Sequence, residues 1–384
     1  MPFNIPKGWL AAVAAIALSA CSGDESTPQT SSVAPASPPA PDAQPKQNAV
    51  VDENGYRVVA SFNVGENTYV RSLIIDAGAN TLWVGTSAGA MEVDLASGDL
   101  RGTYTRDQGL ANEYVFGMHV DRKGNRWFGT NGGGISKYNT DKQWKTYFPM
   151  HGLADYWVYS FAEQSDGTLW IGTWAGLSRL DSEKEEFHTY LDELVNEWVY
   201  GLDVDSKDRV WIGTEGGVNM FDGSNWATWT HEDGLGAANE QNLPISTNTG
   251  LGTRSRHDLT VMAAGQLTYN PNYVFSLMVA QDDTVWAGTW GGGVAHYDGK
   301  QWNNFSTRDG LAGNIVYSVA QDKNGGLWFG TNGGLSYFDG ETWRNFDVGD
   351  GLLDNNIYAI APEANGRIWV GSRSGVVILA PNRG

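Results

Sequence analysis

The sequence contains a single cysteine, Cys21, and few basic side chains for its length. One cysteine cannot form an internal disulfide, so the fold is held without such bridges and does not require an oxidising compartment. Lys and Arg number 25 against 44 Asp and Glu, which gives a formal net charge of −19. Because this charge repels a phosphate backbone and no basic cluster offsets it, we expect no nucleic-acid partner.

Constellations typical of metal sites are also missing. The six histidines are scattered, without a pair at metal-ligand spacing, and no cysteine follows Cys21. No pair of acidic residues stands at a spacing that indicates acid–base catalysis. We therefore predict no metal, no cofactor and no enzymatic activity.

The first 20 residues contain no apolar run long enough to span a bilayer. Residues 9–18 are apolar and follow Lys7, a pattern typical of a targeting segment over residues 1–20. The following letters, Leu-Ser-Ala-Cys at 18–21, resemble the lipobox of bacterial lipoproteins, which implies a lipid anchor on Cys21. The alternative is a free thiol after an ordinary signal peptide. By similarity to proteobacterial lipoproteins, Ser22 after the cysteine favours the outer membrane if the source is Gram-negative.

Residues 21–54 are rich in Ser, Pro, Ala and Gln and show no apolar periodicity. Such a segment cannot bury enough apolar surface to order itself. We interpret it as a disordered tether between the lipid anchor and a folded part.

A short motif, Trp, then an apolar residue, then Gly and Thr or Ser, occurs seven times in the rest of the chain. Its tryptophans are Trp83, Trp127, Trp170, Trp211, Trp286, Trp328 and Trp369. The intervals are 44, 43, 41, 75, 42 and 41 residues. A period in the low forties predicts a repeat fold in which one small sheet per repeat packs on its neighbours.

One full copy, residues 314–352, shows the expected unit. Strands are predicted at 315–320, 327–331, 335–338 and 343–346, separated by Gly-containing turns. A Gly-Leu pair then recurs and begins the crossing to the next copy, as at Gly351 and Leu352. Each copy therefore predicts a four-stranded antiparallel blade whose tryptophan packs between blades.

The ends of the repeat region favour a closed ring. The last copy has only three strands, at 357–362, 368–372 and 376–380, whereas residues 56–62 form a strand before the first copy. The N-terminal strand would complete the last blade and leave no bare sheet edge. We predict an all-β fold, a single seven-bladed β-propeller over residues 55–381.

The repeat resembles the two-component regulator propeller family in its Leu-Trp-x-Gly-Thr, Gly-Gly and Gly-Leu letters. In that family such blades form extracytoplasmic sensor regions of hybrid histidine kinases, several of which detect glycan fragments. The resemblance covers all seven blades, but no kinase, transmembrane helix or immunoglobulin-like domain follows them in this sequence. We therefore expect signalling to need a separate partner.

Two columns of residues are predicted to converge on one rim of the ring, where loops on a rigid scaffold carry function. The first column follows each Gly-Thr or Gly-Ser and comprises Ser87, Asn131, Trp174, Glu215, Trp290, Asn332 and Arg373. The second precedes each first strand and comprises Tyr69, Tyr114, Trp157, Trp198, Tyr273, Ile315 and Asn356. Aromatic platforms among amides and charges suit an oligosaccharide or a peptide. The alternative is that these aromatic residues only plug the channel mouth.

An insertion at residues 236–270 accounts for the 75-residue interval. It groups Arg254, Arg256 and His257 and contains two strand-like stretches, 258–263 and 266–269. A loop of this length is usually functional or disordered. We expect either a lid or docking arm whose arginines bind carboxylates, or a solvated insertion without a role.

Three functions are consistent with these patterns. The leading one is a lipid-anchored envelope protein that binds a glycan or peptide at the rim and passes the ligand or signal to a membrane partner. The second is a non-enzymatic scaffold subunit of an envelope complex, docked through the insertion. The third is a propeller polysaccharide lyase or hydrolase, for which Glu113, Glu197 and Glu215 would be the candidate residues.

Overall fold

The structure is a computed structural model that describes residues 55–66, 68–181, 183–246 and 267–382. All of these lie in one compact unit, Gln47–Gly384. The predicted targeting segment, Cys21 and the tether fall outside the described residues, as do Arg254, Arg256, His257 and the stretch 258–263. No helix among the described residues is long and apolar enough to cross a membrane.

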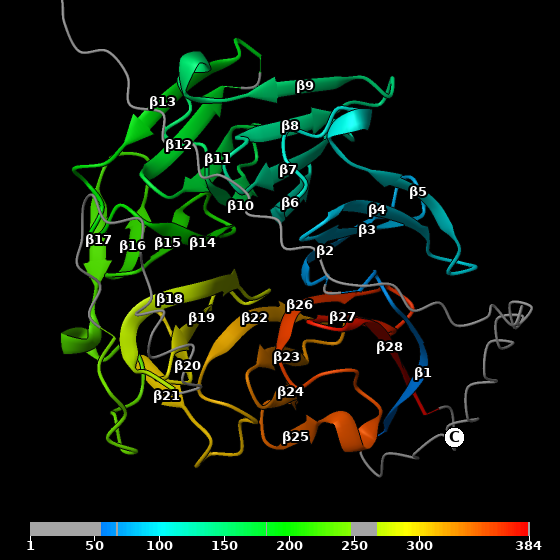
Figure 1. Ribbon diagram of the computed structural model, residues 1–384. Helices are drawn as coiled ribbons and strands as arrows, with labels where there is room; N and C mark the ends of the chain where they lie inside the picture. Colours follow the sequence, from blue (N-terminus) through cyan, green and yellow to red (C-terminus); the bar gives the residue numbers. More distant parts are fainter. Residues whose placement is uncertain (1–54, 67, 182, 247–266, 383–384) are drawn as a thin grey trace, which may run out of the picture. The chain divides into compact units, whose positions relative to one another are not determined.

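Seven four-stranded antiparallel sheets are arranged in a ring (Figure 1), which confirms the predicted seven-bladed β-propeller. The first three blades are β2 (Val70–Asp76), β3 (Thr81–Thr86), β4 (Gly89–Asp94) and β5 (Leu100–Tyr104); β6 (Val115–Val120), β7 (Arg126–Thr130), β8 (Ile135–Tyr138) and β9 (Trp144–Tyr147); and β10 (Val158–Glu163), β11 (Leu169–Thr173), β12 (Gly176–Asp181) and β13 (Glu186–Tyr190). The next three are β14 (Val199–Val204), β15 (Val210–Thr214), β16 (Gly217–Phe221) and β17 (Trp226–Trp229); β18 (Asn270–Val279), β19 (Val285–Trp290), β20 (Val294–Tyr297) and β21 (Trp302–Phe305); and β22 (Val316–Gln321), β23 (Leu327–Thr331), β24 (Gly334–Phe338) and β25 (Trp343–Phe346). The seventh is β26 (Ile357–Pro362), β27 (Ile368–Ser372), β28 (Gly375–Pro381) and β1 (Tyr56–Phe62).

The glycine of each repeated motif lies where the next blade approaches most closely. A Cβ atom on Gly213 would lie 2.6 Å from Cγ1 of Val274, which lies in β18, the first strand of the following blade. The same close approach occurs at each of the seven motifs. The motif therefore requires glycine because any side chain would push neighbouring blades apart.

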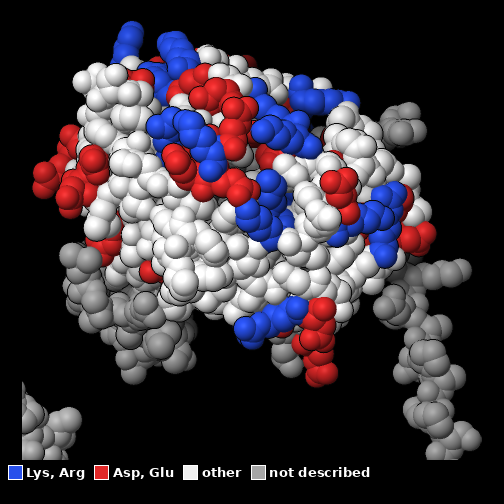
Figure 2. All heavy atoms as spheres, turned by 90° about the horizontal axis from the view of Figure 1, so that it is seen from above, with Lys and Arg blue, Asp and Glu red and all other residues white. Residues whose placement is uncertain are grey.

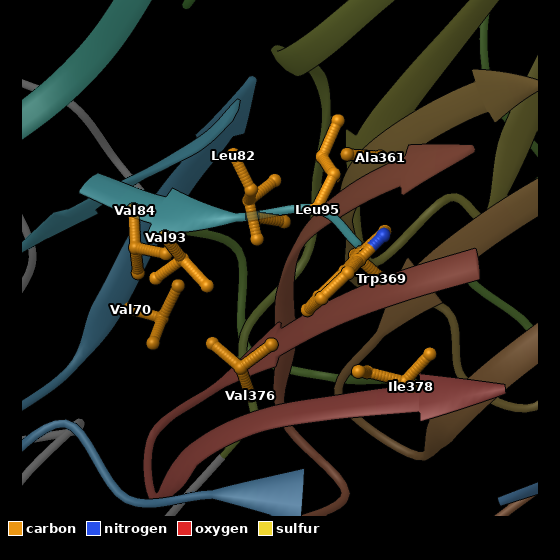
Figure 3. Packing of buried hydrophobic residues seen from close by; sticks show 10 residues of the cluster. Val70, Leu82, Val84, Val93, Leu95, Ala361, Trp369, Val376 and Ile378 are labelled. Carbon is orange, nitrogen blue, oxygen red and sulfur yellow. The ribbon is translucent and has the colours of Figure 1, made fainter. Parts of the chain in front are cut away.

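The last and first blades meet in the same way as the others. A Cβ atom on Gly371 would lie 2.4 Å from Cγ1 of Val70. Figure 3 shows side chains of the two blades directed into one buried cluster, with Val70 and Leu82 on one side and Trp369 and Val376 on the other. Strand β1 pairs antiparallel along β28, from Tyr56 opposite Pro381 to Phe62 opposite Val376.

The seven motif tryptophans are buried between blades, as predicted, with at most 5% of any one exposed. Five of them also donate their indole N–H to a side chain six residues earlier, in the turn before the strand. Trp127 donates to Asp121 at 2.8 Å and Trp328 to Asp322 at 3.0 Å. Four of the five acceptors are acidic and the fifth is Gln164, so these turn residues stabilise the blade by accepting hydrogen bonds.

The Gly-Leu pair ends a short 3-10 turn between blades in four cases: Arg106–Gln108, Pro149–His151, His231–Asp233 and Val348–Asp350. The glycine that follows takes a positive φ, 114° at Gly109, which an L-residue rarely adopts. The leucine after it is buried, with 2% of Leu110 exposed. The pair thus ends the turn and anchors the crossing.

Candidate functional site

The structure brings the two predicted columns together at one rim. In five blades a backbone hydrogen bond joins the residue after the Gly-Thr to the residue before the first strand. The amide of Trp174 donates to the carbonyl of Trp157 at 3.0 Å, and that of Asn131 to the carbonyl of Tyr114 at 2.9 Å. These bonds fix both columns on the rigid ends of strands.

Three tryptophans form a connected cluster at this rim. The Trp174 ring lies 6.0 Å from that of Trp157 and 5.5 Å from that of Trp198, and both pairs meet edge to face. Trp157 and Trp174 are partly exposed, whereas Trp198 is buried. Trp157 and Trp174 therefore offer aromatic surface at the rim, and the buried Trp198 packs against Trp174.

Three other predicted contact residues lie beneath the surface. Trp290 stacks on Tyr273 at 5.5 Å with an interplanar angle of 12°, and its indole N–H donates to Thr268 at 2.9 Å. Only 8% of Trp290 and 1% of Tyr273 is exposed. Glu215 is 3% exposed and accepts a hydrogen bond from the Tyr200 hydroxyl at 3.3 Å. These residues support the rim and are not an open contact surface.

The opposite side of the rim is more polar. Arg373 is exposed and lies over the Tyr69 ring at 5.2 Å. The Asn332 side chain accepts from the amide of the buried Ile315, and the Asn356 side chain donates to Asp354 at 3.0 Å. Asn131 and Tyr114 are half-buried between the two sides, and Ser87 accepts from the Tyr69 amide. The rim is therefore aromatic on one side and polar on the other.

A ring of seven side chains, each two positions after a residue of the second column, surrounds the channel and belongs to neither predicted column. We call it the annulus: Arg71, Phe116, Tyr159, Tyr200, Phe275, Tyr317 and Tyr358. Neighbouring aromatic members contact one another, with ring centroids 4.8 to 5.8 Å apart, as for Phe116 and Tyr159 at 4.8 Å and for Tyr200 and Phe275 at 5.8 Å. The signal in the sequence is an aromatic residue two positions after the second column in six of seven blades.

A β-bulge places each annulus residue. The first strand of every blade pairs with the second on both sides of this residue and skips it, as between Val70 and Ser72. The same register shift occurs at all seven annulus positions. A bulge turns a side chain away from its regular direction, and here it turns each annulus side chain toward the channel.

The annulus lines a cavity of about 290 Å³ in the channel. Burial raises the pKa of the Tyr200, Tyr317 and Tyr358 hydroxyls, so they are neutral at physiological pH and can donate hydrogen bonds. Arg71 is the single charged member of the annulus, and its guanidinium lies 4.9 Å from the Tyr358 centroid and 5.6 Å from that of Phe116. The cavity therefore combines one cation with aromatic walls.

A second group of ionisable side chains lies further along the inner strands. His119 and Glu163 are 3.3 Å apart, and Asp203 accepts from the Val279 amide at 2.7 Å. Burial raises the Asp203 pKa to about 6. Within the described residues, no group of three or more His, Cys, Asp and Glu side chains could hold a metal ion.

The letters Gly-x-Ser-x-Gly of a nucleophile elbow occur at residues 85–89. That elbow requires a turn from a strand into a helix. Here the segment runs from β3 into β4, and the Ser87 hydroxyl accepts from the Tyr69 amide at 3.0 Å. Ser87 therefore has a structural hydrogen bond in a hairpin and lacks the geometry of an elbow.

Charged side chains on the face drawn in Figure 2 are mixed in sign, with Lys and Arg beside Asp and Glu. Among the described residues, exposed charges of opposite sign also form ion pairs, such as Lys184 with Asp181 and Lys145 with Glu185. The face drawn in Figure 2 therefore shows no broad basic field of the kind that favours nucleic-acid binding.

Comparison with solved structures shows the fold. The extracellular domain assigned to a hybrid two component system of B. thetaiotaomicron matches with a TM-score of 0.67 and 23% identity, over 85% of this chain and 41% of that chain. Virginiamycin B lyase from Staphylococcus aureus matches with a TM-score of 0.60 and 12% identity, over 85% and 99%. PorZ, a surface component of the type-IX secretion system of Porphyromonas gingivalis, matches with a TM-score of 0.56 and 15% identity, over 82% and 46%.

The chain thus spans about two fifths of the length of the two component system domain, and the propeller is the part that they share. A search of the curated proteins finds no significant match. The family model described as "Two component regulator propeller" matches at residues 152–175, 310–333 and 351–374. Each match runs from a Gly-Leu pair through a Trp-x-Gly motif, so it coincides with the repeat that builds the blades. Three of the seven repeats of this chain therefore match the two component regulator propeller model.

Proposed function

We propose that this protein is an extracytoplasmic sensory propeller that binds a glycan or peptide at its rim and passes the ligand or signal to a separate membrane partner. The observation that carries the proposal is the pair of partly exposed tryptophans, Trp157 and Trp174, held at strand ends beside polar residues. Sugars and peptide loops both have apolar faces edged by hydrogen-bonding groups, which such a surface suits.

The location supports the same proposal. The lipobox-like letters before Cys21 favour a lipid anchor in the cell envelope, at the outer membrane if the source is Gram-negative. The fold is shared with an extracellular domain of a two component system. Metabolic labelling with a fatty-acid analogue should label the wild-type protein and leave the Cys21→Ser variant unlabelled.

Binding at the rim can be tested with the full chain and a panel of neutral oligosaccharides and short peptides. A ligand that binds the folded state raises its melting temperature. Trp174→Ala and Trp157→Ala should each weaken binding of any positive compound at least tenfold. The matched control is Trp226→Ala, a half-buried tryptophan on the outer strand β17. Unchanged affinity in both rim variants would refute the proposal.

A scaffold role in an envelope complex is the second candidate, and the base of the insertion is the observation that favours it. Residues 244–246 pair with Tyr269, and the Tyr269 hydroxyl donates to the carbonyl of Ala237 at 2.7 Å. The insertion is thus closed at its root and begins from a fixed platform. The similarity to PorZ, a secretion-system component, agrees with this role.

A deletion that tests docking should be shorter than the whole insertion. Thr268 accepts from Trp290, and β18 begins at Asn270, so removing all of 236–270 would damage the blade. Removing residues 247–266 leaves these contacts in place. If the insertion docks a partner, this deletion should abolish co-purification of a crosslinked envelope protein without changing rim binding. Retention of that protein would exclude the docking role.

A further inference from the structure

Arg71 is the exception in an otherwise aromatic annulus. The equivalent residue of every other blade is Phe or Tyr, and all seven sit at the same β-bulge. The bulge itself therefore accepts an aromatic residue, and a seventh would complete the ring. Blade packing gives no reason for a cation at this one position.

The guanidinium of Arg71 has no acceptor among the residues that the structure describes. It lies against three aromatic rings, at 4.9 Å from Tyr358, 5.6 Å from Phe116 and 6.0 Å from Phe275. No ion pair or hydrogen bond joins its guanidinium to another described residue, although nine ion pairs of Lys or Arg occur elsewhere in that part of the chain. Contacts with ring faces stabilise the charge, but they give its five N–H donors no acceptor among the described residues.

A carboxylate is the group that these donors fit. Arginine binds a carboxylate through two parallel hydrogen bonds, and such a bond is stronger where water is partly excluded. The protein has a net charge of −19, so an unpaired cation inside its channel is a local reversal of sign. That reversal makes the channel around Arg71 a favourable place for a small anion.

The remaining walls set the size and shape of the ligand. The cavity of about 290 Å³ lies at the lower end of ligand pockets, so it accommodates a single ring. Aromatic faces of the annulus suit the flat or apolar face of such a ring. The neutral hydroxyls of Tyr317 and Tyr358, whose rings are 4.9 Å apart beside Arg71, can donate to its polar edge.

We propose that the annulus binds a small carboxylate-bearing six-membered ring, with the carboxylate on Arg71 and the ring against the aromatic side chains. This inference deepens the proposed function, because it assigns the channel below the rim to an acidic ligand or to the acidic terminal residue of a larger one. It rests on that proposed function for its biological role. The ring can be a sugar, as in a uronic acid, or an arene, as in an aromatic acid.

The first test uses the wild-type full chain and two matched pairs of probes. Isothermal titration at pH 7 compares D-glucuronate with D-glucose, and benzoate with benzyl alcohol. At least one carboxylate should bind, and at least tenfold more tightly than its neutral counterpart. The better of the two carboxylates identifies the source of the ring. Equal affinity within both pairs, or no binding of either carboxylate at millimolar concentration, would overturn the proposal.

The second test assigns the anion to Arg71. Arg71→Met should weaken binding of the carboxylate at least tenfold, and Arg71→Lys, which keeps the charge but loses the two-pronged geometry, should fall in between. The control is Arg344→Met, since Arg344 also lies over a tyrosine ring, Tyr337 at 5.7 Å, but on the outer part of a blade. Denaturant unfolding of each variant shows whether it folds, and the lysine variant keeps the test valid if the methionine variant does not.

Failure of this inference and failure of the proposed function give different results. Neutral oligosaccharides or peptides that bind through Trp157 and Trp174, with no response to either carboxylate, would overturn the annulus site and leave rim recognition intact. Wild-type affinity for a carboxylate in both Arg71 variants would overturn the assignment to Arg71. Carboxylate binding that is lost in the Arg71 variants, with no rim ligand, would support the annulus alone.

Discussion

The blade interiors and the channel wall differ in how strictly the seven blades repeat. Between blades, every copy has a tryptophan and a glycine at the same positions of the motif. The tryptophan is buried against the neighbouring blade, and the glycine allows the next blade to approach closely. Along the channel the backbone bulge repeats just as strictly, but the side chain on it is arginine in one blade and aromatic in six. The motif tryptophans and glycines, which do not vary, thus maintain the ring. The annulus positions share one backbone conformation but differ in side chain, so ligand chemistry can differ there.

The largest effect on stability is expected for Trp328→Ala, which changes a tryptophan in a blade interior. Trp328 is fully buried and donates to Asp322, so its loss leaves a cavity and an unpaired acceptor. We expect a loss of about 3–5 kcal/mol in the free energy of unfolding, measured by urea denaturation. Trp226→Ala, on an outer strand, should cost less than half as much. Equal losses would mean that the interior tryptophans have no special role in stability.

Asp203, on the inner strand β14, is expected to affect stability in a pH-dependent way. Burial raises its pKa to about 6 from an ordinary value near 3.8, so between these pH values the folded state keeps a proton that the unfolded state releases. Stability should therefore fall as pH rises through this window, by up to about 3 kcal/mol, and stay lower above it.

Asp203→Asn should remove this part of the pH dependence, which urea unfolding at pH 4.5, 5.5 and 7 would measure. His119 and Asp205 also act on the Asp203 carboxyl, so the difference from wild type at each pH is the relevant quantity. Asp99→Asn, on an exposed turn, is the control. A variant curve parallel to that of wild type would contradict the prediction.

The smallest expected effect is at the seam between the last and first blades. Gly371→Ala places a Cβ 2.4 Å from Val70, which should cost about 1–3 kcal/mol, and Val70→Ala in the same chain should recover part of the loss. Gly102→Ala, a strand glycine with contacts no shorter than 3.4 Å, should cost less. If the double variant is no more stable than Gly371→Ala alone, the seam does not close as the other blades do.

The sequence predicts the blades well because their signals are local. Strands β22 to β25 fall within one residue of the ranges expected from residues 314–352, since alternation, turn glycines and the motif tryptophan each act over a few positions. The two rim columns also converge, because they flank strand ends by position alone.

The site is harder to predict because burial there depends on neighbours from other blades. Trp290 and Trp174 occupy equivalent positions, but Tyr273 stacks flat on Trp290 and covers it, whereas Trp174 meets its neighbours at their edges. The annulus is hard to predict for another reason. Regular alternation along a strand would direct these side chains to a face of the blade, and the β-bulge turns them toward the channel instead.

The pairing of β1 with β28 sets an order of events during synthesis. Among the described strands, Tyr56–Phe62 is the first along the chain and its partner Gly375–Pro381 is the last. Contacts between such distant segments form slowly, because a long loop must close before they gain anything. The six other blades can each fold once their own four strands have been synthesised. Strand β1 can pair only after β28 has been made.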